Sequence, residues 1–294
     1  EKKETVSNTF ISPYCVCALS VSLASPKWDK RFQGDEEGFS LPVGPAVPGE
    51  ELGEREAARD RHLARELEKS YQSFDSLSPE WIEKATQALA PYVRQDRMER
   101  VDKVLSQRTQ HCRFLFENPS NPSNVWACLR TLDSFGIQHV DVIMDQSRYR
   151  GKAALTQKRG MRTAMGSAKW ITVRKHLSTP DAVRRLRAQN DKVRLFAADV
   201  NPQSKDIREI EWDTPDDAPV CIVMGNENDG ISDEMRDLVD ESFYIPMVGF
   251  AESFNLSVAT AITLAHLSAC SKGNKGPLRF GDLSDHEFRC LRFK

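Results

Sequence analysis

Short apolar runs alternate with amphipathic stretches through the second half of the chain. An apolar run closed by a polar turn is typical of a buried parallel strand. Between these runs, apolar residues recur at the three- and four-residue spacing of a helix that covers a sheet. The pattern therefore predicts an α/β fold with a mostly parallel sheet covered on both faces. The expected strands lie at residues 114–116, 140–144, 170–173, 194–198, 220–224 and 243–245.

Helices are predicted in the intervals between these strands. Val125, Leu129 and Leu132 follow helical spacing, and Gly136 is the kind of residue at which a helix ends. The strand–helix–strand unit that this helix completes is expected to be right-handed. The other helices expected in this half of the chain lie at residues 179–189, 232–239 and 256–267.

The chain before residue 110 is charged and helix-prone. Ser78 favours the N-cap position, Pro79 suits the first turn and Glu80 complements the helix dipole. A further helix is predicted at residues 93–107, where basic residues recur at about one-turn spacing. Such a face fits contact with an RNA backbone. The acidic residues between the basic ones fit an ordinary solvated helix equally well, so both interpretations stay open.

These patterns divide the chain into four parts. Residues 1–50 lack sustained periodicity and contain a stretch rich in Gly and Pro, so they are predicted to be a disordered or targeting segment. Residues 51–110 form the helical extension, residues 111–272 the α/β domain and residues 273–294 a C-terminal tail. The first residue is Glu1 rather than Met, so a targeting peptide cannot be identified. An intracellular location is expected, and the choice between the cytoplasm and an organelle is left open.

The distribution of charge adds to this picture. The chain of 294 residues is 39% hydrophobic, which is enough to bury a core, and its net charge of -2 does not mark a nucleic-acid binder. Twelve Lys or Arg residues and a single acid lie between positions 148 and 187, whereas acids dominate between positions 206 and 241. This asymmetry fits a side that faces a polyanion, or merely two solvated faces.

Several chemistries have no motif in the sequence. The seven cysteines are scattered without metal-ligand spacing and are interpreted as reduced thiols, so no zinc site is expected. No GxGxxG follows the first strand, and neither a Walker loop nor a nucleophile elbow is present. No run is long and apolar enough to span a membrane.

The first candidate cluster for chemistry lies on the helix after the first strand. Asn124 stands where this helix begins and could cap its free amides. Arg130 follows beside the apolar Leu129. It fits an anion clamp, and it also fits a surface Arg with an ordinary partner.

Two further clusters follow apolar strands. One is Gly225-Asn226-Glu227 with Gly230, and the other is Ile245-Pro246-Met247 with Ser253-Phe254-Asn255 before the last helix. Ligands of open α/β sheets bind at the carboxyl ends of the strands. One composite pocket is therefore expected.

Jointly, these clusters resemble the motifs of the SpoU branch of the SPOUT RNA methyltransferases. The matching residues are Asn124 with Arg130-Thr131, then Gly225-Asn226-Glu227 with Gly230, Ile245-Pro246-Met247 with Gly249, and Glu252-Ser253-Phe254-Asn255-Leu256-Ser257-Val258-Ala259. The resemblance covers about residues 110–270. It implies a SPOUT-type parallel sheet with a C-terminal trefoil knot, which spacing alone does not predict. It also implies that the helical extension at residues 51–110 contacts RNA, and that the protein is a homodimer whose interface is formed by the knot helices.

The resemblance implies an enzyme that transfers a methyl group from S-adenosyl-L-methionine to a ribose 2′-hydroxyl of RNA. Arg130 is then the essential catalytic residue, with Asn124, Glu227, Ser253 and Asn255 in supporting roles. A free guanidinium cannot act as the base, since its pKa exceeds about 12. Arg130 therefore either orients the hydroxyl or acts after an RNA phosphate alters its pKa. The positions implied to hold the cofactor are Ala198, Met224, Gly225, Asn226, Gly230, Ile245, Met247 and Phe254.

Two of these positions depart from the family pattern. Ala198 stands where relatives often have Thr, and Phe254 where they usually have Leu. The segment Arg208-Glu209-Ile210-Glu211-Trp212 resembles the tRNA branch of the family, which implies the D-loop guanosine of tRNA as the substrate. Ribosomal RNA is the nearest alternative substrate. A catalytically silent RNA-binding protein with the same fold is the alternative of a different class.

Overall fold

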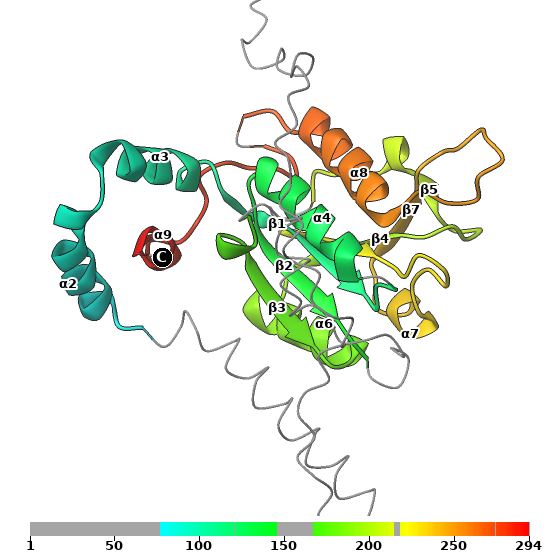
Figure 1. Cartoon of the computed structure of the whole chain (residues 1–294). Helices are drawn as coiled ribbons and strands as arrows, with labels where there is room; N and C mark the ends of the chain where they lie inside the picture. Colours follow the sequence, from blue (N-terminus) through cyan, green and yellow to red (C-terminus); the bar gives the residue numbers. More distant parts are fainter. Residues whose placement is uncertain (1–76, 121, 146–166, 215–217, 274, 294) are drawn as a thin grey trace, which may run out of the picture. The chain divides into compact units, whose positions relative to one another are not determined.

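The computed structural model describes residues 77–120, 122–145, 167–214, 218–273 and 275–293 (Figure 1). Their central element is a seven-stranded parallel sheet with the strand order β3-β2-β1-β6-β4-β7-β5. The strands are β1 (Thr109–Glu117), β2 (Ile137–Ile143), β3 (Thr172–His176), β4 (Arg194–Ala198), β5 (Lys205–Asp206), β6 (Val220–Met224) and β7 (Glu241–Tyr244). The prediction of a parallel α/β sheet is confirmed. The trefoil knot stays a prediction.

Strands β4 and β6 have the predicted bounds, since each is a largely apolar run between polar turns. β3 begins at Thr172 rather than at Trp170. The amides of Trp170 and Ile171 both donate to the carbonyl of Ser167 and complete a 3-10 turn, η2 (Ser167–Lys169), before the strand starts. β7 begins two residues before the predicted position because Glu241 already pairs with Phe196 of β4. The short strand β5 was not predicted.

The alternation of side chains along β1 separates two cores. Phe114 and Phe116 belong to one buried cluster and Leu115 to the other, as the two-residue period of a strand requires. The first cluster includes side chains of α4 (Pro122–Ser134) and α8 (Leu256–Cys270), and the second those of α6 (Thr179–Gln189) and α7 (Asp233–Arg236). Figure 1 shows α4 and α8 side by side, and the two helices are in contact.

The predicted helix at residues 232–239 ends early. Helix α7 covers only Asp233–Arg236. The amides of Leu238 and Val239 both donate to the carbonyl of Met235, which closes a turn instead of extending the helix. The chain then turns so that the Asp240 carboxylate accepts a hydrogen bond from the amide of Leu195 at 2.8 Å, next to β7. Helix α6, in contrast, has the predicted bounds.

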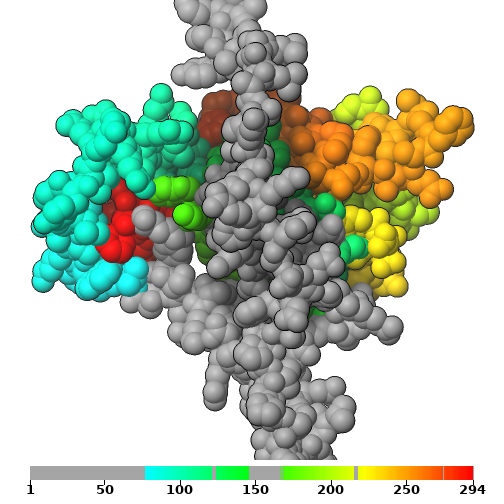
Figure 2. Space-filling view, in the orientation of Figure 1, coloured from blue at the N-terminus to red at the C-terminus, as the bar shows by residue number. Residues whose placement is uncertain are grey.

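Helices from before and after the sheet pack together. Helix α2 (Pro79–Leu89) begins as predicted after Ser78, whose hydroxyl accepts a hydrogen bond from the amide of Trp81 at 3.2 Å. The 3-10 turn η1 (Ala90–Tyr92) and helix α3 (Gln95–Leu105) follow. Helix α9 (Asp285–Phe293) contacts both α2 and α3. In Figure 2 the red surface of the last residues adjoins the cyan surface of these N-terminal helices.

In the part of the chain that the structure describes, no helix is both long and apolar enough to cross a membrane. The same residues hold no group of three or more side chains that could bind a metal ion. The predicted segment at residues 1–50 lies outside the described residues. So do residues 148–166 of the basic stretch.

Candidate active site

Four adjacent strands end at one edge of the sheet. β1, β6, β4 and β7 are neighbours, and all are parallel, so their carboxyl ends lie on the same side. The candidate clusters lie on the loops that leave this edge and on the starts of α4 and α8, except for Arg130, which lies further along α4. This is the position at which open α/β sheets bind their ligands.

The turn after β6 is closed on itself. Asn226 and Gly230 exchange two backbone hydrogen bonds, with N···O distances of 2.8 and 2.9 Å. Gly230 has a φ of +69°, and a Cβ on Gly225 would lie 2.3 Å from the carbonyl carbon of Gly230. Glycine is therefore required at position 225 by the turn itself, since any side chain there would force the turn open.

The Glu227 carboxylate joins the first two clusters. Its Oε1 accepts a hydrogen bond from Asn124 Nδ2 at 2.6 Å, and its Oε2 accepts one from the amide of Ser120 at 2.7 Å. Asn124 is the third residue of α4 and not its N-cap, and its side-chain amide donates to a distant loop, so the capping expectation was wrong. Among the described residues no ion pair links Glu227 to Arg130. Glu227 therefore ties the first turn of α4 to the turn after β6.

Two residues that the sequence analysis did not single out, Asn118 and Ser120, complete this network. Asn226 Nδ2 donates to the carbonyl of Asn118 at 2.5 Å, and Ser120 Oγ donates to Asn226 Oδ1 at 2.8 Å. Asn118 Oδ1 also accepts from the amide of Asp145 at 2.8 Å. Within the described ranges Asn118 is the only non-glycine residue with a positive φ, 46°, a conformation that Asn tolerates better than most residues. A polar turn directly after an apolar strand was the signal that could have found them.

The Glu117 carboxylate lies beneath these loops and is 2% exposed. It accepts hydrogen bonds from Thr179 Oγ1 at 2.6 Å and from the hydroxyl and amide of Ser232 at 2.7 and 2.8 Å. These donors stand at the starts of α6 and α7. Glu117 therefore fixes both helices to the end of β1.

Asp199 has a similar position at the end of β4. It accepts hydrogen bonds from Arg236 Nε and Asn201 Nδ2, both at 2.8 Å. Burial raises the pKa of Asp199, but the hydrogen bonds from Arg236 and Asn201 outweigh that effect and hold the pKa below its usual range. The carboxylate is therefore charged and bonded, and it anchors α7 below the turn that contains Gly230.

Arg130 differs from these anchored groups. It is exposed on α4, and its guanidinium forms no ion pair with any described residue. It lies six residues after Asn124 on the same helix, which places the two Cα atoms about 9 Å apart along the axis. Cys128 and Thr260 stand 3.5 Å apart, Sγ to Oγ1, and join α4 to α8. Arg130 therefore extends from a helix that is fixed at its first turn by Asn124 and along its length by α8.

The third cluster leads into α8. Asn255 is the N-cap of this helix, and its Oδ1 accepts from the amide and hydroxyl of Ser257 at 2.9 and 2.7 Å. Ser253 is exposed and bonds to no described residue, and Phe254 is 37% exposed. The structure thus gives the Asn255 side chain a local role in starting α8.

Residues 246–254 have the properties that an adenosyl group requires of a binding loop. None of their backbone groups bonds to another described backbone group. Ile245 and Ala198, the latter at the end of β4, pack against the core and are partly buried, and Met247 is also partly buried. A flat ring with polar edges can bond to such backbone groups and contact such apolar side chains. The residues therefore fit the cofactor that the resemblance implies.

The fold and this site define a parallel α/β protein with a ligand site at the carboxyl edge of its sheet. The sequence pattern of the SpoU rRNA Methylase family matches residues 111–265, more than half of the chain. The chain belongs to this family.

Relatives of the chain agree with this assignment. It is similar to the tRNA (guanosine(18)-2'-O)-methyltransferase of Escherichia coli (strain K12), with 33% identity over 168 residues, 57% of this chain and 67% of that protein. An enzyme of the same name from Borreliella burgdorferi is 28% identical over 179 residues, 61% of this chain and 76% of that protein. The crystal structure of the A. aeolicus TrmH/SpoU tRNA modifying enzyme has a TM-score of 0.53 at 24% identity, covers 67% of this chain and 93% of its own, and confirms the fold.

Proposed function

We propose that this protein transfers a methyl group from S-adenosyl-L-methionine to the ribose 2′-hydroxyl of a tRNA D-loop guanosine. Membership of a methylase family supports the reaction, and the names of the relatives support the substrate. The bridge from Glu227 to Asn124 and Ser120 carries the proposal. It unites the family's first and second motifs at the edge where a ligand binds. Ribosomal RNA is the second candidate substrate, since the matching family is named for it.

The cofactor would be held by the turn at residues 225–230, by Ile245 and Met247, and by the backbone near Phe254 and Ala198. When bound, S-adenosyl-L-methionine supplies an electrophilic methyl group on a positively charged sulfur. Met224 is 2% exposed, so its contribution would come from the backbone. Asn226 uses its side chain to hold Asn118 and Ser120. Its role is therefore to keep the turn in one conformation.

Arg130 is proposed to bind and orient the ribose hydroxyl. A guanidinium is a planar cation with five N–H donors and no acceptor. It can therefore donate hydrogen bonds to the hydroxyl oxygen or to a neighbouring phosphate, which orients that oxygen toward the methyl group. The anchors at Asn124 and Glu227 fix the helix that carries it. Alignment of two reacting groups of this kind is worth roughly 7–11 kcal/mol of the barrier.

The helical extension is proposed to contact the RNA backbone. Arg97, Arg100 and Lys103 follow one another at three-residue spacing on α3, all are exposed, and none forms an ion pair with a described residue. Arg94 differs, because it pairs with Asp96 at 2.6 Å. Cations that keep no protein partner can release counterions from phosphates when RNA binds.

A homodimer through α8 is also proposed. Val248 and Phe250 are fully exposed, and Val258 on α8 is 45% exposed. A second copy placed against α8 would remove these side chains from water, which stabilises a contact by roughly 1.5–3 kcal/mol for each large apolar side chain. Light scattering coupled to size exclusion tests this. A mass of one chain at micromolar concentration would contradict it.

Methyl transfer from labelled S-adenosyl-L-methionine to purified tRNA and ribosomal RNA tests the function. The wild type is expected to label tRNA, and Arg130→Ala to lose the labelling while it still binds tRNA. Arg184→Ala removes an exposed Arg that pairs with Asp181 on α6 and serves as the matched control. Mapping of the methylated nucleotide completes the test. Label in ribosomal RNA alone would overturn the substrate, and RNA binding without any transfer would indicate a silent RNA-binding protein.

A further inference from the structure

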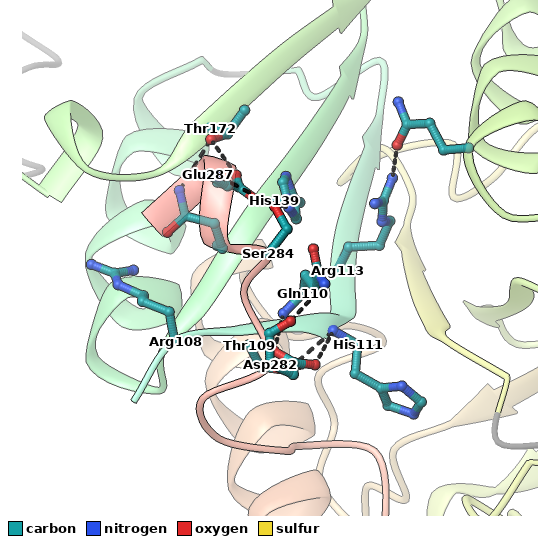
Figure 3. Close-up of polar contacts among 12 residues, drawn as sticks. Arg108, Thr109, Gln110, His111, Arg113, His139, Thr172, Asp282, Ser284 and Glu287 are labelled. Atoms are coloured by element: carbon teal, nitrogen blue, oxygen red, sulfur yellow. Dashed lines mark hydrogen bonds and ion pairs between the residues drawn. The ribbon is translucent and has the colours of Figure 1, made fainter. Parts of the chain in front are cut away.

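A second polar cluster lies at the opposite, amino-terminal edge of the sheet (Figure 3). Asp282 accepts hydrogen bonds from the amides of Gln110 and His111 at 2.7 and 3.0 Å, through Oδ1 and Oδ2. Gln110 Nε2 returns a hydrogen bond to the carbonyl of Asp282 at 2.6 Å. The amide of Gly281 donates to the carbonyl of Arg108 at 3.0 Å. These hydrogen bonds hold the segment before α9 against the start of β1, which follows α3 in the chain.

Helix α9 then contacts the sheet through one carboxylate. Ser284 accepts the amide of Glu287 at 3.2 Å and caps the helix. In a Ser-x-x-Glu capping box the Glu side chain would return to the Ser amide. Here the Glu287 carboxylate instead lies 3.2 Å from His139 Nε2 on β2 and accepts from Thr172 Oγ1 on β3 at 3.4 Å.

The His139 ring is held in one orientation by its other nitrogen. Arg174 Nη1 lies 2.9 Å from His139 Nδ1, and because Arg can only donate, Nδ1 must accept. Nε2 therefore carries the proton that points to Glu287. His139 is 4% exposed, so this contact is directional and shielded from water.

The other side of α9 contacts the N-terminal helices. Arg292 donates to both oxygens of Asp102 on α3, at 2.7 and 3.2 Å. The Phe293 ring lies edge-on to Trp81 of α2, with 5.3 Å between the ring centroids. Leu291 is fully buried. Helix α9 thus has its sheet contact at Glu287 and its α3 contact at Arg292.

We propose that residues 278–293, which we call the C-terminal clasp, position the RNA-binding face of α3 relative to the methyl-transfer site. Glu287 and Arg292 are positioning residues in this scheme, since they act through α3 and do not touch the substrate. The proposal rests on the function proposed above. It adds that Arg97, Arg100 and Lys103 meet the RNA backbone in register only while α9 connects α3 to the sheet.

The dependence of tRNA affinity on salt tests this proposal. Binding of a fluorescent tRNA transcript would be measured across a series of KCl concentrations. The triple variant Arg97→Ala, Arg100→Ala, Lys103→Ala should reduce the slope of log affinity against log salt by about 2–3, since each lost phosphate contact removes about 0.7–0.9. Glu287→Ala should produce a comparable reduction. Glu287→Ala combined with the triple variant should reduce the slope no further, because both changes remove the same contacts.

Conservative variants separate positioning from general damage to the fold. Glu287→Gln keeps an oxygen that can accept from His139 Nε2, so it should retain the wild-type slope. Arg292→Ala releases α3 from the other side of α9 at a site that is 35% exposed, and it should lower the slope even if Glu287→Ala does not fold. Glu241→Gln, which breaks the ion pair with Lys205 at the far edge of the sheet, should have no effect.

The outcomes also distinguish this proposal from the proposed function. If the wild type methylates tRNA and the variants Glu287→Ala and Arg292→Ala have the same salt slope as the wild type, only the clasp proposal is overturned. Additive losses in the combined variant would overturn it too, because they would show that α9 and α3 act independently. Clasp-dependent RNA binding by a protein that transfers no methyl group would overturn the function and leave the clasp in place.

Discussion

The two edges of the sheet use polar side chains in opposite ways. At the carboxyl edge, Glu227 and Asn226 hold the loops in place, while the backbone groups of residues 246–254 bond to no other described backbone group. Further along α4, the Arg130 guanidinium forms no ion pair with a described residue. At the amino edge, Asp282 and Glu287 each use both carboxylate oxygens on protein groups. A substrate site has to leave donors and acceptors available, whereas a structural cluster that links segments of the protein satisfies and buries them. A reactive cluster can therefore be told from a structural one by whether its donors and acceptors lack partners within the protein.

The largest expected effect is on stability and concerns Glu117, which lies at the carboxyl edge but has a structural role. Glu117→Ala would leave the hydroxyl of Thr179 and the hydroxyl and amide of Ser232 without their acceptor. Each buried unsatisfied donor costs about 1–3 kcal/mol, so the free energy of unfolding should fall by about 3 kcal/mol or more. Urea unfolding measures this. Glu117→Gln keeps one acceptor and should lose roughly half as much, and a loss in Glu117→Ala below about 1 kcal/mol would show that water replaces the carboxylate.

Glu227→Ala should have the reverse profile, with a large effect on activity and a small one on stability. It frees Asn124 and Ser120 from the turn after β6, so α4 and Arg130 can shift relative to the site. A misplacement of about 1 Å can lower the rate about 100-fold, which steady-state methylation of tRNA would detect.

The matched control for this variant is Asp229→Ala in the same turn. Asp229 is exposed and uses only its amide, which donates to Asn226 Oδ1 at 3.3 Å. Its loss should leave kcat/KM within about twofold of the wild type, as expected for a surface substitution. Equal losses in the two variants would mean that the charge of the turn, and not the bridge, matters for catalysis.

The comparison of the two edges also shows which elements of the fold and which contacts of the site could be predicted from the sequence. β4, β6 and α6 have the predicted bounds since apolar runs and caps are local signals. The contact of Glu227 with Asn124 spans 103 residues and depends on β6 lying beside β1, which no local pattern encodes. The family motifs could group these residues, but not show that Asn124 donates to Glu227.

The clasp lay beyond sequence prediction for a different reason. Asp282 and Glu287 resemble any solvated acids, and only the Ser284-to-Glu287 spacing has a local meaning, that of a helix start. Their partners are main-chain amides of β1 and a histidine on β2. These partners exist only after the sheet has formed.

A moderate effect is expected from pH at the amino edge. Burial lowers the pKa of His139, the contact with Glu287 opposes this shift, and the charges of Arg113 and Arg174 add to it. An unfolded His has a pKa of about 6.5, so below that pH the unfolded chain binds a proton that the folded ring does not. Stability should therefore fall as the pH drops below about 6.5, by at most about 1.4 kcal/mol per pH unit.

Urea unfolding of the wild type and His139→Gln at a series of pH values checks this. The variant should be less stable at neutral pH but lose less stability between about pH 6.5 and pH 5.5. Burial raises the pKa of Glu287, yet the hydrogen bond with His139 outweighs it and the pKa is lowered. The contribution of Glu287 is therefore lost only at lower pH, within and below the ordinary carboxylate range. Identical pH profiles for the two proteins would exclude His139 as the source.

The smallest effect is expected at Ser120, which combines a structural backbone contact with a hydroxyl at the surface. Its amide binds Glu227, but its hydroxyl lies at the surface, donating to Asn226 Oδ1 at 2.8 Å and accepting from Asn228 Nδ2 at 3.1 Å. Ser120→Ala keeps the amide and lets water take the place of the hydroxyl. The turn should therefore loosen slightly, and kcat should fall about three- to fivefold, the size of one exposed hydrogen bond. The KM for tRNA should stay unchanged, because the proposed phosphate contacts lie on α3. Asn228→Ala removes only the second of these bonds and should lower kcat less than Ser120→Ala. The reverse order would mean that the Ser120 hydroxyl acts by holding Asn228 and not Asn226.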